Sequence, residues 1–243
     1  MDDEGAGLGE AATEGAAGAP LRRPRRTAGK VQAARRAAAT ALIMDHAEAL
    51  FAERGYGVPL SEVAQHAGVD TALLRYYFGD KAGLFRAVFK RRGPVINELR
   101  LKAMAEYRRA SGGAMTLEGI IDAFVRPSLE KAAEDEGWRN YMAIVAYVNS
   151  SRGELDRLMS ETFDHVSREL IADMRTILPA ASEDELYWGY HFLTGAFTFS
   201  LGQTGRIDHV SEGRVSSQDM MAIADRLPVV LAAGIRAICQ RPG

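Results

Sequence analysis

Apolar residues recur at three- and four-residue intervals along most of this chain, and this spacing gathers them on one face of an α-helix. The clearest stripe consists of Ile43, Ala47, Leu50 and Phe51, inside a helix expected over about residues 31–54. No segment shows the apolar–polar alternation of a half-buried strand, and no internal repeat is visible. The pattern predicts an all-α fold.

Glycine, proline and capping residues divide the remaining pattern into further helices. Gly55 is placed to end the first helix in a left-handed conformation. Gly93 and Pro94 are expected to bend or interrupt a later one, because proline lacks the N–H that a helix interior needs. Ser182 and Glu185 form the sequence signature of a capping box. The helices expected after residue 80 cover about 81–92, 95–110, 117–136, 138–150, 153–177, 182–203 and 217–239.

The segment 59–78, PLSEVAQHAGVDTALLRYYF, has the pattern of a helix-turn-helix. Its first helix carries apolar Val63 and Ala64, and Gly68 provides the turn. Asp70 is suited to cap a second helix that displays polar and aromatic side chains. In a helix-turn-helix the second helix enters the major groove of DNA, so the segment favours nucleic-acid recognition.

Charge is strongly segregated along the 243 residues, although the whole chain carries a net charge of only −2. Residues 1–20 hold five acidic side chains and no Lys or Arg. Residues 21–92 hold fourteen Lys and Arg against six Asp and Glu, a net of +8, and residues 93–243 carry a net of −5. The basic block surrounds the predicted helix-turn-helix, which favours contact with a phosphate backbone over a merely solvated face.

Other function classes find little support in the sequence. A single cysteine, Cys239, excludes an internal disulfide and a thiolate metal cage and is typical of a reducing cytoplasm. The five histidines lack metal-ligand spacing, and no nucleophile elbow, phosphate-binding loop or dinucleotide glycine pattern occurs. No apolar run is long enough to span a membrane, and the N-terminus lacks the apolar core of a secretory signal. We therefore expect a cytoplasmic protein that is not an enzyme and uses no metal or cofactor.

Three consecutive segments from residue 43 onward resemble the TetR family of bacterial transcription regulators. They are IMDHAEALFAERGYG, LSEVAQHAGV and TALLRYYFGDKAGLF, which are similar to the family's first helix, second helix and recognition helix with the junction that follows. One residue is missing from the loop at Gly57. Residues 91–101 and 122–130 resemble one subclass of the family's C-terminal domains. The resemblance implies a three-helix DNA-binding head and a larger helical body.

The resemblance and the charge pattern together divide the chain into three parts. Residues 1–30 are expected to be a disordered acidic segment followed by a basic arm. Residues 31–92 form the DNA-binding domain, and residues 93–243 form the helical domain for effector binding and dimerisation. The arm, residues 21–30, either follows DNA phosphates or serves as a flexible solubilising tail, and the sequence favours neither interpretation.

The resemblance also implies a set of DNA-contacting positions. Tyr77 and Lys81 stand where family members contact phosphates, and Arg75 is placed either to read a guanine edge or to contact a phosphate. Leu73 either meets a thymine methyl group or is buried. Pro59 departs from the family pattern, because a Ser or Thr is common there. The predicted set is Arg35, Arg36, Ser61, Thr71, Ala72, Leu73, Arg75, Tyr76, Tyr77 and Lys81.

Large aromatic and sulfur-containing residues are frequent in the predicted body. For any single one, an ordinary place in the core is the simpler interpretation. TetR-like bodies commonly enclose an apolar effector pocket, so the resemblance implies that some of these residues line one. The predicted ligand-binding residues are Phe124, Trp138, Tyr141, Met142, Tyr147, Phe163, Trp188, His191 and Phe192.

The last two long predicted helices combine small residues, which permit close helix approach, with apolar surface. In TetR-like proteins this pair forms a four-helix dimer interface. A two-fold dimer implies a palindromic operator with half-sites near one helical turn apart. The predicted interface residues are Gly195, Phe199, Leu201, Val229 and Leu231.

The sequence therefore predicts a sequence-specific regulator of transcription, in the form of a homodimeric repressor that a small apolar effector releases from operator DNA. An activator or an effector-independent DNA binder is the first alternative. An all-helical enzyme or ligand carrier is the second. The sequence does not identify the effector or the operator.

Overall fold

The computed structural model describes residues 25–239, and the regular elements within them are helices without a strand. The all-α fold predicted from the sequence is confirmed. Two compact units are present, Met1–Ala38 and Ala39–Gly243. In the first, the described residues form the N-terminal part of α1 (Arg25–Arg54). The elements that follow α1 are η1 (Gly55–Gly57), α2 (Leu60–His66), α3 (Thr71–Phe78), α4 (Lys81–Ala110), α5 (Leu117–Glu134), α6 (Glu136–Asn149), α7 (Glu154–Ile177), α8 (Glu183–Leu201), α9 (Arg206–Val210) and α10 (Met220–Cys239).

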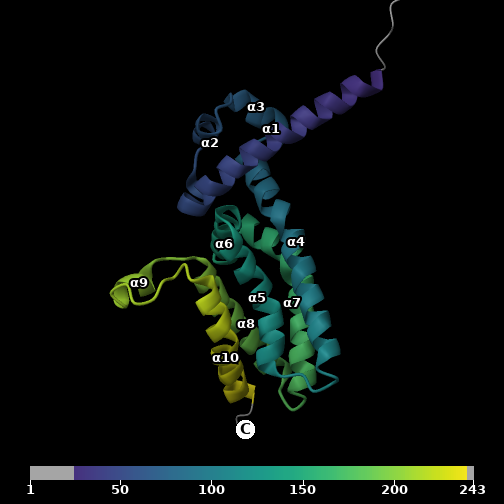
Figure 1. The fold of residues 1–243 in the computed structure, drawn as a ribbon, viewed down its shortest axis with the longest axis vertical. Coiled ribbons are helices and arrows are strands. Elements are labelled where there is room, and N and C mark those ends of the chain that lie inside the picture. Colours follow the sequence, from purple (N-terminus) through teal and green to yellow (C-terminus); the bar gives the residue numbers. More distant parts are fainter. Residues whose placement is uncertain (1–24, 240–243) are drawn as a thin grey trace, which may run out of the picture. The chain divides into compact units, whose positions relative to one another are not determined.

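The head of the second unit consists of the C-terminal part of α1, the turn η1, the short helices α2 and α3, and the start of α4 (Figure 1). The apolar stripe predicted on α1 is buried here, with Ile43 and Ala47 fully inaccessible. Phe51 of α1 and Phe85 of α4 meet edge to face, with ring centroids 5.0 Å apart. Leu74 anchors α3 in the same core. The head therefore folds around one apolar cluster to which each of its helices contributes.

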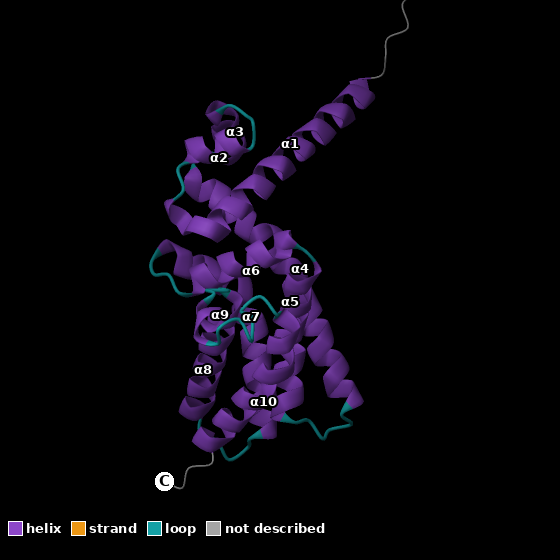
Figure 2. Ribbon diagram, turned by 60° about the vertical axis from the view of Figure 1, so that its left-hand side comes forward, coloured by secondary structure: helices purple, strands orange, loops and turns teal. Residues whose placement is uncertain are grey.

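The body is a helical bundle with α5 at its centre. α5 packs against α4, α6, α7 and α10, and α8 packs against α6, α7 and α10. Figures 1 and 2 show the long helices running side by side, and Figure 1 shows the short α9 in a loop that extends away from them. No helix among the described residues is both long and apolar enough to cross a membrane. The bundle leaves the outer faces of α8 and α10 exposed, and this determines which surface is available for association.

α4 is one continuous helix, although the sequence predicted a bend or an interruption at Gly93 and Pro94. The predicted interruption, with separate helices at 81–92 and 95–110, was wrong because packing outweighs the lost backbone hydrogen bond. A Cβ atom at Gly93 would lie 2.7 Å from Thr162 and 3.2 Å from the hydroxyl of Tyr141, so only glycine permits this approach of α4 to α6 and α7. Tyr141 also donates a hydrogen bond of 3.0 Å to the carbonyl of Phe89. Pro94 lies on the exposed side of the helix.

The other predicted helices are present with shifted ends. α1 begins at Arg25 rather than at about residue 31, so the described part of the predicted basic arm is helical. The predictions for residues 1–24 lie outside the described residues. α9 is a short helix within 204–216, a stretch predicted to be a break. The capping box predicted at Ser182 and Glu185 is confirmed.

Candidate functional site

Three local features close the turn between α2 and α3. Gly68 has a φ of +64°, which a residue with a side chain rarely adopts. The backbone N–H of Val69 donates to the carbonyl of Ala64 at 3.0 Å. The carboxylate of Asp70 accepts a hydrogen bond of 2.7 Å from the backbone N–H of Ala72. The N-cap predicted at Asp70 is confirmed, and it fixes where α3 begins.

The other end of α3 is fixed against α4. Gly79, with a φ of +80°, ends α3. Asp80 caps α4, because its carboxylate accepts a hydrogen bond of 2.8 Å from the backbone N–H of Gly83. A Cβ atom at Gly83 would lie only 2.0 Å from the carbonyl oxygen of Phe78, so glycine is needed for this close approach. α3 is therefore held at both ends.

The outer face of α3 carries the DNA-contacting residues that the sequence predicted. Leu74 is fully buried, so the opposite face of α3 is directed outward. Ala72 and Arg75 are exposed, and Tyr76 is 71% exposed. Ser61, on α2, is also exposed. The half-buried members of the predicted set are Thr71, Leu73, Tyr77 and Lys81.

Aromatic contacts position the two predicted phosphate-contacting residues. The ammonium nitrogen of Lys81 lies 4.4 Å from the ring centroid of Tyr56, a cation–π contact that holds it at the junction of α3 and α4. The rings of Tyr76 and Tyr77 meet edge to face at 5.2 Å. The structure thus brings the predicted residues of α3 and the start of α4 into one surface with a positive and aromatic character.

Arg35 and Arg36 complete the predicted set. Both side chains are exposed on α1, and both belong to the unit Met1–Ala38 rather than to the unit that holds α3. Their contact with DNA stays a prediction.

A helix capped at both ends, with exposed arginine and tyrosine side chains and within a basic segment, has the geometry of a recognition helix. Residues 43–88 match the sequence profile described as bacterial regulatory proteins, tetR family. Residues 122–234 match the profile described as Tetracyclin repressor-like, C-terminal domain. The chain belongs to the TetR family.

Solved structures share the fold of this TetR-family protein. The regulator FadR from Bacillus subtilis, solved in complex with stearoyl-CoA, is 16% identical, with a TM-score of 0.58 over 79% of this chain and 97% of that chain. HlyIIR, a haemolysin II transcriptional regulator, is 18% identical, with a TM-score of 0.57 over 81% and 98%. FadR from Bacillus halodurans, a fatty acid degradation regulator, is 18% identical, with a TM-score of 0.50 over 79% and 97%. No curated protein matches the chain by sequence.

Membership of the TetR family makes the protein a DNA-binding regulator of transcription and not an enzyme. α3 lies within residues 43–88, the segment that matches the tetR-family profile. At identities below 20%, the similar structures support the fold and leave the ligand open.

The predicted ligand-binding residues of the TetR-like body fall into two groups. One group faces the interior, where aromatic residues from α5, α6 and α7 are packed together. The other group lies on the outer faces of α6 and α8. The buried residues are Phe124, Tyr141, Met142 and Phe163, with Trp138 half-buried. The exposed residues are Tyr147, Trp188, His191 and Phe192.

The sequence interpretation missed one charged residue within the buried group. Arg100 is only 5% exposed, although it lies on a helix whose other arginines reach solvent. Ile96 and Met104, four residues before and after it, are both buried. This i, i+4, i+8 spacing was the available signal that Arg100 shares the buried face of its helix.

The predicted dimerisation residues also divide by burial. Gly195, Phe199 and Val229 are exposed, with Phe199 at 63%. Leu201 and Leu231 turn into the core of their own chain, at 1% and 8% exposure. Any association through α8 and α10 would therefore use the first three residues directly, with Leu201 and Leu231 supporting the helices from within.

Proposed function

We propose that this regulator is a homodimeric repressor that binds a palindromic operator in double-stranded DNA and leaves it when a small molecule binds the body. The outer face of α3 carries the proposal. Arg75 and Tyr76 project from it, and Lys81 adjoins its C-terminal end. Because α3 is capped at both ends, its exposed side chains would be presented to the major groove in a fixed orientation.

The exposed apolar faces of α8 and α10 support the homodimer. Trp188, Phe192 and Phe199 follow one another at helical spacing on α8, and each is more than half exposed. Val229 on α10 is 58% exposed. Large apolar side chains exposed on neighbouring helices in this way are usually covered by a partner. A second copy fits, because a palindromic operator requires two identical heads related by a two-fold axis.

The buried aromatic group of the body supports a ligand response. Similar folds accommodate small molecules, and FadR from Bacillus subtilis was solved with stearoyl-CoA. α4 runs without a break from the head into this part of the body, so a ligand that shifts α4 would move the head. The ligand would favour a head spacing that does not fit successive major grooves. By reciprocity, DNA would weaken ligand binding by the same factor.

Fluorescence anisotropy with DNA from the region beside the gene tests the DNA-binding part of the proposal. We expect specific binding whose affinity falls steeply with salt, by a log–log slope of about −0.9 for each phosphate neutralised. Lys81→Ala should weaken binding to all sequences, whereas Arg75→Ala should relax the preference at one base position if Arg75 reads a base. Arg109→Ala, which removes an exposed charge at the far end of α4, is the matched control.

Transcription in vitro from the bound promoter separates repression from activation. Addition of the protein should lower the transcript level. A rise would show an activator, and binding that does not distinguish the chosen region from unrelated DNA would overturn the proposal of a specific operator.

A further inference from the structure

The described part of the chain buries three charged side chains, and two of them are paired. Glu48 accepts hydrogen bonds from two arginines. Asp173 accepts two from Arg108, each of 2.7 Å. Arg100 is the exception, because no Asp or Glu among the described residues pairs with it. A buried charge without a counter-ion is unusual in a folded protein and calls for an explanation.

The surroundings of Arg100 are aromatic rather than acidic. Its guanidinium carbon lies 4.6 Å from the ring centroid of Phe124, 5.4 Å from that of Phe197 and 5.6 Å from that of Phe163. Its Nε donates one hydrogen bond, of 3.2 Å, to the hydroxyl of Ser128. Within the described residues the two terminal nitrogens form no hydrogen bond. They are the pair that binds both oxygens of a carboxylate in a parallel, bidentate arrangement.

The aromatic rings compensate only part of the charge. Cation–π contacts stabilise a guanidinium, but they satisfy none of its N–H donors. Burial lowers the pKa of Arg100 to about 10, so the side chain still carries its charge at neutral pH. The fold therefore keeps a charged side chain among aromatic rings, with one hydrogen bond to Ser128.

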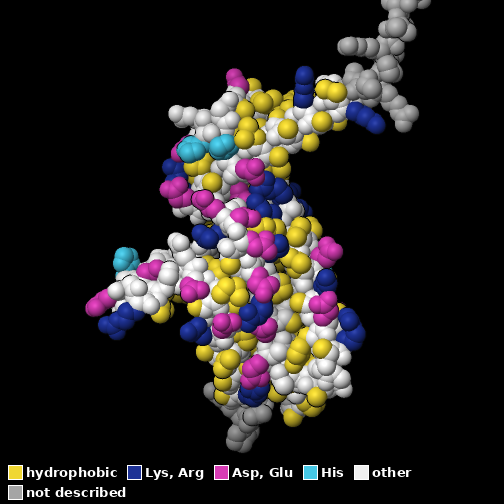
Figure 3. Space-filling view, in the orientation of Figure 1, with side chains coloured by type: hydrophobic (Ala, Val, Ile, Leu, Met, Phe, Trp, Pro, Cys, Tyr) yellow, Lys and Arg dark blue, Asp and Glu magenta, His cyan; other side chains and the backbone are white. Residues whose placement is uncertain are grey.

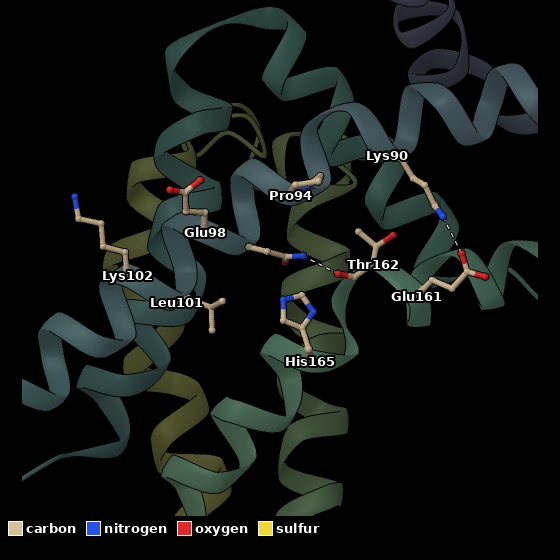
Figure 4. Close-up of a pocket in the computed structure, with 9 residues that line it drawn as sticks. Lys90, Pro94, Glu98, Leu101, Lys102, Glu161, Thr162 and His165 are labelled. Carbon is tan, nitrogen blue, oxygen red and sulfur yellow. Dashed lines mark hydrogen bonds and ion pairs between the residues drawn. The ribbon is translucent and has the colours of Figure 1, made fainter.

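An open groove lies between α4 and α7 (Figure 4), and its lining includes residues next to Arg100 and Phe163 in the sequence but neither of these two residues. Its volume is about 780 Å³. Asn97 and Leu101, which flank Arg100 on α4, line it, as does Thr162 on α7. Figure 4 shows Leu101 and His165 projecting toward each other from the two helices. Asn97 donates a hydrogen bond of 2.6 Å to the carbonyl of Thr162, and its own carbonyl oxygen is buried without a partner. The groove is large enough for a small molecule, and one polar atom of its lining, the side-chain oxygen of Asn97, has no hydrogen-bond partner.

We propose that the body binds a small molecule with a single carboxylate and an apolar remainder, and that Arg100 pairs with the carboxylate. Phe124, Phe163 and Phe197 would contact the apolar remainder, together with the walls of the adjoining groove. A monoanion matches the site because Arg100 is the one buried cation of the described residues. This inference rests on the proposed ligand response, and it replaces the purely apolar effector expected from the sequence with an acidic one.

Matched pairs of probes test the assignment on the full-length protein without DNA. The probes are straight-chain alkanoates from hexanoate to dodecanoate and phenylalkanoates, each beside the primary alcohol of the same skeleton and each below its micelle concentration. We expect at least one carboxylate to raise the melting temperature more than its alcohol and to give a measurable Kd by calorimetry. If no carboxylate exceeds its alcohol, the proposal is overturned.

Two variants connect the preference to Arg100. Arg100→Met keeps an unbranched, flexible side chain and removes the charge, so it should abolish the preference and lower carboxylate affinity by about tenfold or more. Arg100→Lys should keep a preference with weaker binding, because it retains the charge without the bidentate fork. If Arg100→Met does not fold, Arg100→Lys decides alone. Unchanged carboxylate affinity in a folded Arg100→Met would overturn the role of Arg100. The same conclusion would follow if Arg100→Lys bound each carboxylate no better than its alcohol.

Operator binding, measured by anisotropy without any probe, keeps this inference separate from the proposed function. Absence of a carboxylate preference in the unmodified protein, together with intact operator binding, would overturn the role of Arg100 and leave the proposed regulator function standing. Carboxylate binding without operator binding would overturn the proposed operator binding and leave the role of Arg100 standing.

Discussion

At the scale of single residues, two glycines show how backbone conformation and packing combine. Gly55 and Gly68 have almost the same positive φ, +65° and +64°. Only Gly55 is crowded, because a Cβ atom there would lie 2.8 Å from Cε2 of Tyr147, whereas nothing lies within 4 Å of one at Gly68. A comparison of the two positions therefore distinguishes two effects of adding a side chain: the strain of a left-handed backbone, and a steric clash between the head and α6.

We expect Gly68→Ala to lower the free energy of unfolding by about 1–2 kcal/mol, through the left-handed conformation alone. Gly55→Ala should lower it further, because it adds the contact with Tyr147. The additional loss should shrink in the double variant with Tyr147→Ala. Urea denaturation of the three variants measures these differences. Equal losses at the two glycines would show that the ring of Tyr147 moves aside freely.

At the scale of elements, α4 decides how the head is connected to the body. Its sequence contains Gly93 and Pro94, two residues that are unfavourable in a helix interior. The helix continues because Tyr141 and Thr162 pack against the glycine while the proline faces outward. The predicted boundary between residues 92 and 93 consequently falls inside one helix, and a displacement in the body can reach the head without crossing a loop.

Pro94→Ala is expected to raise the free energy of unfolding by about 1–3 kcal/mol, since it restores a backbone donor in the helix interior. Val95→Ala, at the exposed neighbouring position, should change it by less than about 0.5 kcal/mol. Chemical denaturation monitored by circular dichroism compares the two. A loss of stability in Pro94→Ala would mean that the proline acts mainly by restricting the unfolded chain.

At the scale of the whole molecule, a buried carboxylate connects the head with the body. Glu48 of α1 is 2% exposed and pairs with Arg91 at 2.6 Å and with Arg92 at 3.0 Å. Arg91 also pairs with exposed Asp45 at 2.6 Å. Arg92 lies 4.6 Å from the ring of Trp138 on α6. Figure 3 shows basic and acidic side chains close together where α4 passes from the head to the body.

Glu48→Gln should lower the free energy of unfolding by about 3–5 kcal/mol, because it leaves two partly buried guanidinium groups without their carboxylate. Asp45→Asn removes the exposed partner of the same Arg91 and should cost less than about 1 kcal/mol. Urea denaturation of both variants gives the comparison. Equal stability of the two would show that solvent replaces the buried carboxylate.

The proposed dimer is also a property of the whole molecule. The double variant Phe199→Glu/Val229→Glu should be monomeric at concentrations where the unmodified protein is dimeric, because it places charges on the apolar faces of α8 and α10. Size-exclusion chromatography with light scattering measures the mass. Tyr76→Ala, on α3, should remain dimeric while losing DNA affinity. A monomeric unmodified protein would contradict the proposed interface.

The sequence by itself determined the fold class, the position of the helix-turn-helix and the caps at Asp70 and Ser182. These features depend on neighbours within one or two helical turns, so helical periodicity, glycines and capping side chains were sufficient to predict them. The basic block around α3 could also be predicted from the sequence, because it is a property of consecutive residues.

Only the tertiary structure decided which helix faces which neighbour. In the tertiary structure α4 continues through Gly93 and Pro94, and Arg100 is buried among aromatic rings. Leu201 faces the core, whereas Trp188 faces outward. Each of these outcomes depends on residues far away in the sequence, such as Tyr141 beside Gly93 or Phe197 beside Arg100. An amphipathic pattern shows that a helix has a buried side, whereas the packing of the other helices determines what that side meets.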